Sequence, residues 1–185
     1  MMSGASGARN RIFGNIANMS RLYTAWYCVA MREIAVLLHN VRSAHNVGSV
    51  LRSADGAGAS AVYLSGYTPV PVDRFGRPQK EIAKTALGAE TSMRWEYATS
   101  PVVVIERLKK EGWTIVGVEQ DARSIDYRKF VAAARTLFIF GNEVRGIAPA
   151  LRDRCDALIE IPMHGQKESL NVSVAAGVIL FSFCG

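Results

Sequence analysis

The sequence has few of the residues that build disulfide frameworks or metal sites. It contains three cysteines and three histidines among 185 residues. The cysteines are odd in number, far apart and free of any CxxC pair, which argues against both a disulfide framework and a cysteine-ligated metal; they are Cys28, Cys155 and Cys184. His39, His45 and His164 lack metal-ligand spacing. We therefore expect no metal and a reducing, cytoplasmic location.

Two common catalytic fingerprints are also missing. The chain has no GxxxxGK[ST] phosphate loop and no GxSxG nucleophile turn. The stretch GAGASA at 56–61 fits the spacing of dinucleotide-binding loops, but its glycines end a predicted helix and precede a predicted strand. A phosphate would have to meet the start of a helix. We interpret this stretch as a helix C-cap.

No apolar run is long enough to cross a membrane. The longest early patch, residues 22–30, is followed by Arg32 and Glu33, and no clear signal-peptide cleavage site follows it. We expect no membrane association. Residues 1–30 are predicted to be an N-terminal extension outside the functional unit, and residues 31–185 are predicted to form one domain.

Basic residues outnumber acidic ones. The 22 lysines and arginines against 16 acidic residues give a net charge of +6 and a pI near 9.5. This balance favours an anionic partner, with nucleic acid as the leading candidate. The 49% apolar content is enough for one sizeable core.

Short apolar runs alternate with helical patterns along the chain. The runs typical of buried strands lie at 33–38, 60–66, 113–119, 136–140 and 157–161. Helical patterns lie at 47–58, 81–87, 102–112 and 174–181, with a helical turn within 147–154. Continuous apolar strands separated by helices predict an α/β domain with a mostly parallel sheet and helices on both faces.

Three loops that follow predicted strands carry unusual polar content. They are HNVRSAHNVGSVLR (39–52), GNEVRGIAP (141–149) and PMHGQKESLN (162–171). Ligands of open α/β sheets bind beyond the carboxyl ends of strands, so converging loops would form one site. Gly141 and Gly146 suit either a close approach of a ligand or an ordinary tight turn. Ser169, Asn171 and Ser173 suit the start of a helix.

These loops also carry a family resemblance. NVRSAHNVGSVLRSADGAG (40–58), LFIFGNEVRGI (137–147) and IEIPMHGQKESLNVSVAAGV (159–178) resemble, in order, the three motifs of the SpoU, or TrmH-like, RNA 2'-O-ribose methyltransferases of the SPOUT class. The resemblance implies a C-terminal trefoil knot that binds S-adenosylmethionine, a homodimer and an RNA substrate, either tRNA or rRNA. It spans residue 31 to the end.

Residue by residue, the resemblance implies two sets of site residues. The catalytic set is Asn46 and Arg52 of the first motif, Glu143 of the second, and Ser169 and Asn171 of the third. The set expected around the cofactor is Phe140, Gly141, Asn142, Ile161, Met163 and Leu170.

The predicted reaction is methyl transfer to a ribose 2'-hydroxyl. Arg52 would hold the phosphate beside the target ribose or accept the hydroxyl proton, and the first role suits a group that stays protonated. Asn46 and Glu143 would orient Arg52 and the substrate, while Ser169 and Asn171 would hold the substrate backbone or the loop. Two alternatives stay open: a knotted-class enzyme that methylates RNA bases, and a non-catalytic RNA-binding protein.

Overall fold

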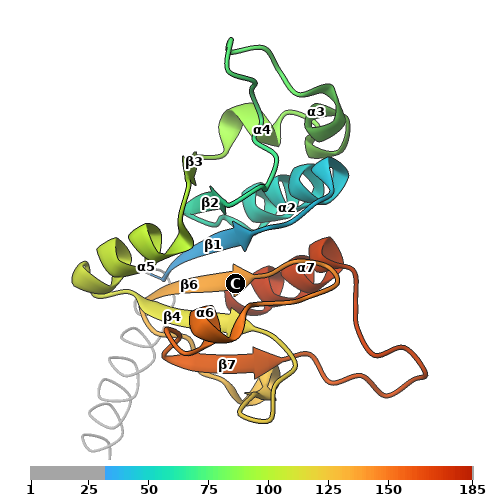
Figure 1. Cartoon of the computed structure of the whole chain (residues 1–185). Helices are drawn as coiled ribbons and strands as arrows, with labels where there is room; N and C mark the ends of the chain where they lie inside the picture. Colours follow the sequence, from blue (N-terminus) through green and yellow to red (C-terminus); the bar gives the residue numbers. More distant parts are fainter. Residues whose placement is uncertain (1–31, 185) are drawn as a thin grey trace, which may run out of the picture. The chain divides into compact units, whose positions relative to one another are not determined.

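The computed structural model describes residues 32–184, which form a seven-stranded sheet and its covering helices (Figure 1). The strands are β1 (Glu33–His39), β2 (Ala61–Ser65), β3 (Trp95–Ala98), β4 (Thr114–Val118), β5 (Ile125–Asp126), β6 (Arg135–Phe140) and β7 (Ala157–Glu160). The helices are α2 (Ala44–Ala57), α3 (Lys80–Ala86), α4 (Ala89–Ser92), α5 (Pro101–Lys110), the 3-10 turn η1 (Tyr127–Lys129), α6 (Pro149–Arg152) and α7 (Val172–Phe183).

Every strand pair in the sheet is parallel, and the strand order is β3-β2-β1-β6-β4-β7-β5. The first three strands follow one another outward, so β2 pairs with β1 and β3 lies at the edge. On the other side of β1, β6 lies between β1 and β4, and β7 lies between β4 and the edge strand β5. All strands therefore end at the same edge of the sheet, where the loops after β1, β4, β6 and β7 are neighbours.

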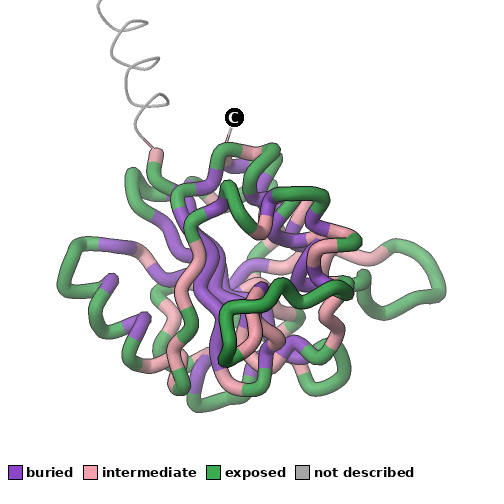
Figure 2. The backbone as a smooth tube through the Cα atoms, turned by 90° about the horizontal axis from the view of Figure 1, so that it is seen from above, coloured by how far each residue is buried: buried purple, intermediate pink, exposed green. Residues whose placement is uncertain are grey.

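Apolar side chains alternate between the two faces of the sheet. Val36 and Leu38 pack into one core with residues of α2, α3 and α7, whereas Ala35 and Leu37 pack into a second core with residues of α5 and α6. Figure 2 shows the buried strands running through the middle of the domain with exposed loops around them. The prediction of an α/β domain with a parallel sheet and helices on both faces is confirmed.

Helix α2 begins earlier than predicted. The pattern placed its start at Val47, but the structure starts it at Ala44 because the Ser43 side chain accepts a hydrogen bond from the Asn46 backbone N–H. Asn46 therefore lies in the first helical turn. At the other end Gly58 adopts a left-handed φ of 77° as the C-cap, which confirms the capping interpretation of 56–61.

The short elements β3, α4 and β5 carry no clear signal in the sequence. The four residues of β3 are mostly half-buried at the sheet edge, and β5 has only two residues. Periodicity needs longer segments with a buried face. Helix α7 extends beyond the predicted residues 174–181 at both ends. It starts at Val172 because Asn171 caps it there, and it ends at Phe183.

Some predictions are not tested by the fold. Residues 1–30 lie outside the described part, and the trefoil knot stays a prediction. Within residues 32–184, the longest helices are too short or too polar to cross a bilayer.

Candidate active site

The three polar loops meet at the carboxyl edge of the sheet. Asn46 in α2 donates from Nδ2 to Glu143 Oε1 over 3.1 Å, and Asn171 donates from Nδ2 to Asn46 Oδ1 over 3.2 Å. These bonds join segments 97 and 125 residues apart in the sequence. One side chain from each motif therefore takes part in a continuous chain of hydrogen bonds, Glu143–Asn46–Asn171.

Glu143 is an ionised anchor for the start of α2. Its carboxylate accepts hydrogen bonds from the backbone N–H groups of Arg42, at 3.1 and 3.2 Å, and of Ser43, at 3.2 Å. Partial burial alone would raise the pKa of Glu143, but these backbone bonds and the one from Asn46 outweigh it and hold the pKa below its ordinary value. A carboxylate with a lowered pKa is a weak base, so Glu143 suits positioning better than proton transfer.

Asn171 has a second task as the N-cap of α7. Its Oδ1 accepts from the Ser173 backbone N–H at 2.8 Å and from Ser173 Oγ at 2.7 Å. The amide therefore satisfies the free end of the helix with its oxygen and reaches Asn46 with its nitrogen. The capping interpretation of this stretch is confirmed for Asn171.

Arg52 lies apart from this chain of hydrogen bonds. It is exposed on α2, six residues beyond Asn46, which corresponds to about 9 Å along a helix axis. Within residues 32–184 its side chain makes no hydrogen bond or ion pair, so it is not bonded to Asn46 or Glu143.

A cavity of about 200 Å³ opens next to the Glu143–Asn46–Asn171 chain. It is built from segments that follow β4, β6 and β7 and from the start of α7. All six residues predicted to surround the cofactor line it: Phe140, Gly141, Asn142, Ile161, Met163 and Leu170. Glu143 and Ser169 of the predicted catalytic set also line it, whereas Asn46, Arg52 and Asn171 do not.

The loop after β6 folds back on itself to form one wall of this cavity. Asn142 and Gly146 exchange backbone hydrogen bonds of 3.1 and 2.8 Å. A Cβ on Gly141 would lie 2.3 Å from the backbone carbon of Gly146, and Gly146 itself has a φ of 62°. Glycine is therefore required at both positions by the tight turn, whether or not a ligand approaches.

The side chain of Asn142 is fully used in holding this loop. Its Nδ2 donates to the Asn40 carbonyl at 3.1 Å and to the Tyr67 hydroxyl at 3.0 Å, and its Oδ1 accepts from the backbone N–H groups of Val144 and Arg145. Asn142 is buried, and no donor of its amide is left for a ligand. Its contribution to the cavity is the shape of the wall.

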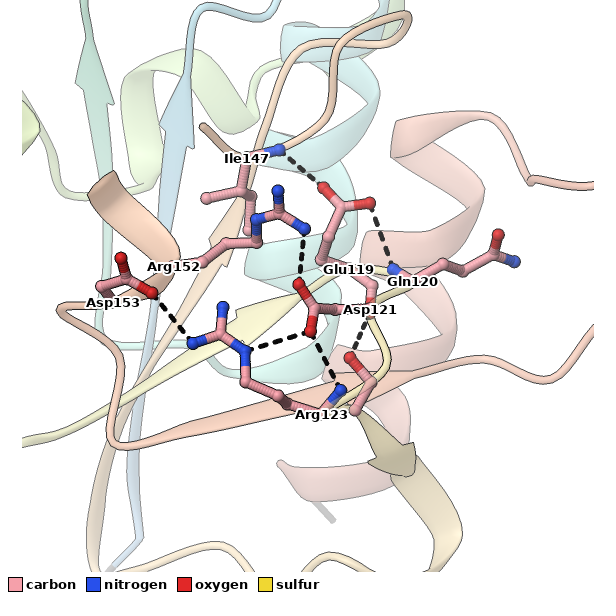
Figure 3. Close-up of polar contacts among 8 residues, drawn as sticks. Glu119, Gln120, Asp121, Arg123, Ile147, Arg152 and Asp153 are labelled. Carbon is pink, nitrogen blue, oxygen red and sulfur yellow. Dashed lines mark hydrogen bonds and ion pairs between the residues drawn. The ribbon is translucent and has the colours of Figure 1, made fainter. Parts of the chain in front are cut away.

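Glu119 is a cavity residue that the sequence analysis missed. Its Oε2 accepts from the Ile147 backbone N–H at 2.6 Å, and its Oε1 accepts from the Gln120 backbone N–H at 3.1 Å (Figure 3). Gln120 in turn donates to the Glu168 carbonyl at 2.6 Å. Glu119 follows β4 at the same sheet edge as the three polar loops, so the rule that selected those loops could have selected it.

An ion-pair network supports the segment after Glu119. Asp121 contacts Arg152 at 2.5 Å and Arg123 at 3.1 Å, and Arg123 also reaches Asp153 at 2.9 Å (Figure 3). Hydrogen bonds from Arg123, with the charges of Arg123 and Arg152, lower the pKa of Asp121 to about 2. The network ties the segment after β4, which begins with the cavity residues Glu119 and Gln120, to α6 and the residue that follows it.

The segment before α7 is exposed. Residues 164–171 are all exposed, and the Ser169 side chain makes no hydrogen bond within residues 32–184. Ser169 therefore offers a free hydroxyl at the cavity rim. In the same described range, no three His, Cys, Asp or Glu side chains lie close enough together to hold a metal ion.

Comparison with known proteins links this geometry to one family. Residues 33–181 match the SpoU rRNA Methylase family. The chain is 37% identical over 150 residues to the 23S rRNA (guanosine-2'-O-)-methyltransferase RlmB of Salmonella typhi, covering 81% of this chain and 59% of that protein. It is 33% identical over 146 residues to a putative TrmH family tRNA/rRNA methyltransferase of Staphylococcus haemolyticus, covering 79% and 56%. The chain thus spans less than two thirds of the length of these curated relatives.

Solved structures of similar fold belong to the same family. The SpoU methyltransferase AviRb from Streptomyces viridochromogenes, in complex with the cofactor AdoMet, superimposes with a TM-score of 0.73 at 28% identity and covers 83% of this chain and 60% of its own. The A. aeolicus TrmH/SpoU tRNA modifying enzyme superimposes with a TM-score of 0.72 at 26% identity and covers 90% and 82%. The chain belongs to the SpoU rRNA methylase family.

Proposed function

We propose that this protein transfers the methyl group of S-adenosylmethionine to a ribose 2'-hydroxyl of tRNA or rRNA. The observation that carries the proposal is the meeting of the three motif segments through the Glu143–Asn46–Asn171 chain beside one cavity. The names of the relatives, which include 23S rRNA guanosine-2'-O-methyltransferases, support the same reaction.

The residues of the cavity fit S-adenosylmethionine. Ile161, Met163 and Leu170 supply apolar contacts for an aromatic ring, and the acidic residues Glu119, Glu143 and Glu160 among the lining residues suit a positively charged ligand. When bound, this cofactor supplies an electrophilic methyl group on a sulfonium sulfur. We assign the apolar side chains and the backbone of the loop after β6 to holding it.

The protein's own contribution to the reaction is positioning. The 2'-oxygen must face the methyl group, and its proton must leave as the new bond forms. The planar fork of donors on a guanidinium matches a phosphate, so we assign Arg52 to the phosphate beside the target ribose and leave the hydroxyl proton to water. Asn46, held between Glu143 and Asn171, orients the ribose, and the free hydroxyl of Ser169 contacts the substrate backbone.

We also propose that two copies of the chain form a homodimer. Helix α7 leaves two large apolar side chains uncovered, with Val174 51% and Phe181 63% exposed. Obligate interfaces bury such side chains.

We also propose a cytoplasmic location. Cys155 and Cys184 are free thiols, which suits the cytoplasm as the location of an RNA-modifying enzyme.

Alkaline hydrolysis tests the proposed product. Alkali cleaves RNA through attack of the 2'-hydroxyl on the neighbouring phosphate, so a 2'-O-methyl group protects one bond. Unmodified tRNA and rRNA are incubated with the protein and methyl-labelled cofactor, then hydrolysed and sized. We expect label in an alkali-resistant dinucleotide. Label confined to mononucleotides would indicate base methylation, and no label on any RNA would favour a non-catalytic binding protein.

A further inference from the structure

A second hollow lies on the surface between the loop after β2 and the edge strand β3. Its volume is about 450 Å³, which is within the range of small-ligand sites. None of the residues that line it is charged: they are Gly66, Tyr67, Thr68, Pro69, Val70, Gln79, Trp95 and Tyr97. The hollow is therefore a neutral, largely aromatic surface on a basic protein.

Three aromatic rings form its walls. Tyr67 is 57% exposed, Tyr97 is 44% exposed, and Trp95 is half-buried. The Tyr97 hydroxyl donates to the Gly66 carbonyl at 2.8 Å, which fixes the position of that ring. Exposed rings held in a fixed position are the surfaces on which unpaired nucleobases stack.

Gln79 adds a hydrogen-bonding group to the rim. It occupies the N-cap position of α3, yet its side chain makes no capping bond, and it has no other side-chain partner within residues 32–184. A free amide offers two donors and an acceptor. This combination of stacking surface and free amide matches the face and the edge of a nucleobase.

One hydrogen bond connects a residue of the hollow with a residue of the active-site cavity. Tyr67 lines the hollow, and its hydroxyl accepts the 3.0 Å hydrogen bond from Asn142, which lines the cavity. The backbone N–H of Tyr67 donates a hydrogen bond of 3.2 Å to Asn40 Oδ1, which fixes the backbone at Tyr67. A base in the hollow would therefore belong to a nucleotide near the one whose ribose enters the active site.

The loop between β2 and α3, which supplies part of the hollow, also carries basic residues. In the loop between β2 and α3, Phe75 is 66% exposed, with the guanidinium of Arg74 at 4.7 Å and that of Arg77 at 5.1 Å from its ring centre. Arg77 is paired with Asp73, whereas Arg74 has no ion pair within residues 32–184. Lys80 follows at the start of α3. Lys80 is the sequence neighbour of Gln79, which lines the hollow, so it is the cation best placed for a phosphate of the same RNA strand.

We infer that the hollow of Tyr67, Trp95, Tyr97 and Gln79 binds an unpaired nucleobase of the substrate RNA, next to the target nucleotide. The inference rests on the proposed function, because it names a subsite for the same RNA. It implies that the enzyme selects an unpaired segment and leaves a regular duplex unbound at this site.

Direct binding tests the inference without any need for turnover. A labelled unpaired RNA of about 12 nucleotides and an abasic ribose-phosphate strand of the same length are titrated with the full chain by fluorescence anisotropy. Both strands carry the same phosphates, so their difference isolates the bases. We expect the strand with bases to bind about 10-fold more tightly or better, as the loss of one stacked base predicts. Equal affinity of the two strands would overturn the inference.

Variants at Tyr97 test whether the preference for the strand with bases arises in the hollow. Tyr97→Ala removes the ring, and we expect it to lose most of the preference for bases while its affinity for the abasic strand stays within about 2-fold. Tyr97→Phe keeps the ring and removes only the hydroxyl, so it is the matched control and should retain the preference. A full preference in Tyr97→Ala, or an equal loss in both variants, would contradict stacking on this ring.

Gln79→Ala provides a second variant outside the sheet in case Tyr97→Ala does not fold. We expect it to reduce the preference for bases by about 3- to 10-fold, since it removes one hydrogen-bonding group. An unchanged preference would overturn the role of the hollow. A chain that methylates RNA but shows no base preference would refute only this inference, and a base preference without methyl transfer would refute only the proposed function.

Discussion

One added methyl group at Gly141 tests the geometry of the cavity wall. In Gly141→Ala the new Cβ would lie 2.3 Å from the Gly146 backbone carbon, 2.4 Å from its oxygen and 2.5 Å from the Ile147 nitrogen. All three neighbours are backbone atoms, so rotation of a side chain cannot relieve the clash. The loop is also held by the 2.6 Å bond from Ile147 to Glu119. We therefore expect the turn between Gly141 and Gly146 to open.

The size of the effect follows from the contacts. Cβ atoms do not approach backbone closer than 3.0 Å, so the strands of the turn must separate by about 0.7 Å. This stretches the 3.1 Å bond from Asn142 to Gly146 beyond hydrogen-bonding distance. Lost bonds and overpacking together cost about 2–4 kcal/mol of the free energy of unfolding, or about 6–12 °C in Tm. The same shift should weaken cofactor binding by about 30-fold or more, because this wall lines the cavity.

Calorimetry with S-adenosylmethionine and its demethylated product measures the affinity, and thermal unfolding measures the stability. Gly165→Ala is the matched control, because its Cβ would meet nothing within 4 Å and it lies in the loop that follows β7. We expect the control to match the wild-type chain in both measurements. Wild-type affinity and wild-type Tm in Gly141→Ala would show that this loop does not shape the cofactor site.

Three further predictions concern the RNA side, the titration of the site and the assembly. Arg52→Ala should abolish methyl transfer and leave cofactor affinity within a few-fold, whereas the control Lys110→Ala at the end of α5 should retain both methyl transfer and cofactor affinity; near-normal turnover of Arg52→Ala would remove it from the mechanism. Because the pKa of Glu143 is depressed on folding, its stabilising contribution is present above the unfolded pKa and is lost as the pH falls through the folded value. The Tm of Glu143→Gln should therefore lie below that of the wild-type chain at pH 7, and the two should converge as the pH falls below the ordinary value of 4.5; a constant difference would refute this. Light scattering should give a dimer for the wild-type chain and a smaller species for Phe181→Ser, whose side chain is 63% exposed in the single chain; a monomeric active enzyme would contradict the homodimer.

Much of the site can be predicted from the sequence because the motifs lie directly after strands. Phe140, Gly141, Ile161 and Met163 were predicted near the cofactor, and the structure places all of them on one cavity. Their position follows from strand endings, which apolar runs reveal.

Other members of the site were missed. Glu119 directly follows β4, so the strand-end rule applied to it, but it belongs to no motif of the resemblance, and its partner Ile147 lies 28 residues further along the chain. The aromatic hollow combines Tyr67 with Trp95 and Tyr97 of a four-residue edge strand, whose short pattern predicts nothing. Such groupings depend on which strands become neighbours, and a single sequence does not encode this in its local pattern.

By itself, the sequence determined the alternation of strands and helices, the glycine-containing helix C-cap within residues 56–61 and the three segments that carry polar groups at strand ends. These features are local, since each depends on hydrophobic period, glycine conformation or motif spacing within a few residues. Only the tertiary structure decided that β6 and β7 return to lie between earlier strands, which brings Glu143, Asn46 and Asn171 into one chain of hydrogen bonds and leaves Arg52 exposed outside it. The physical reason is that strand order is set by the burial of both sheet faces against helices distant in sequence, a property of the whole core rather than of any single segment.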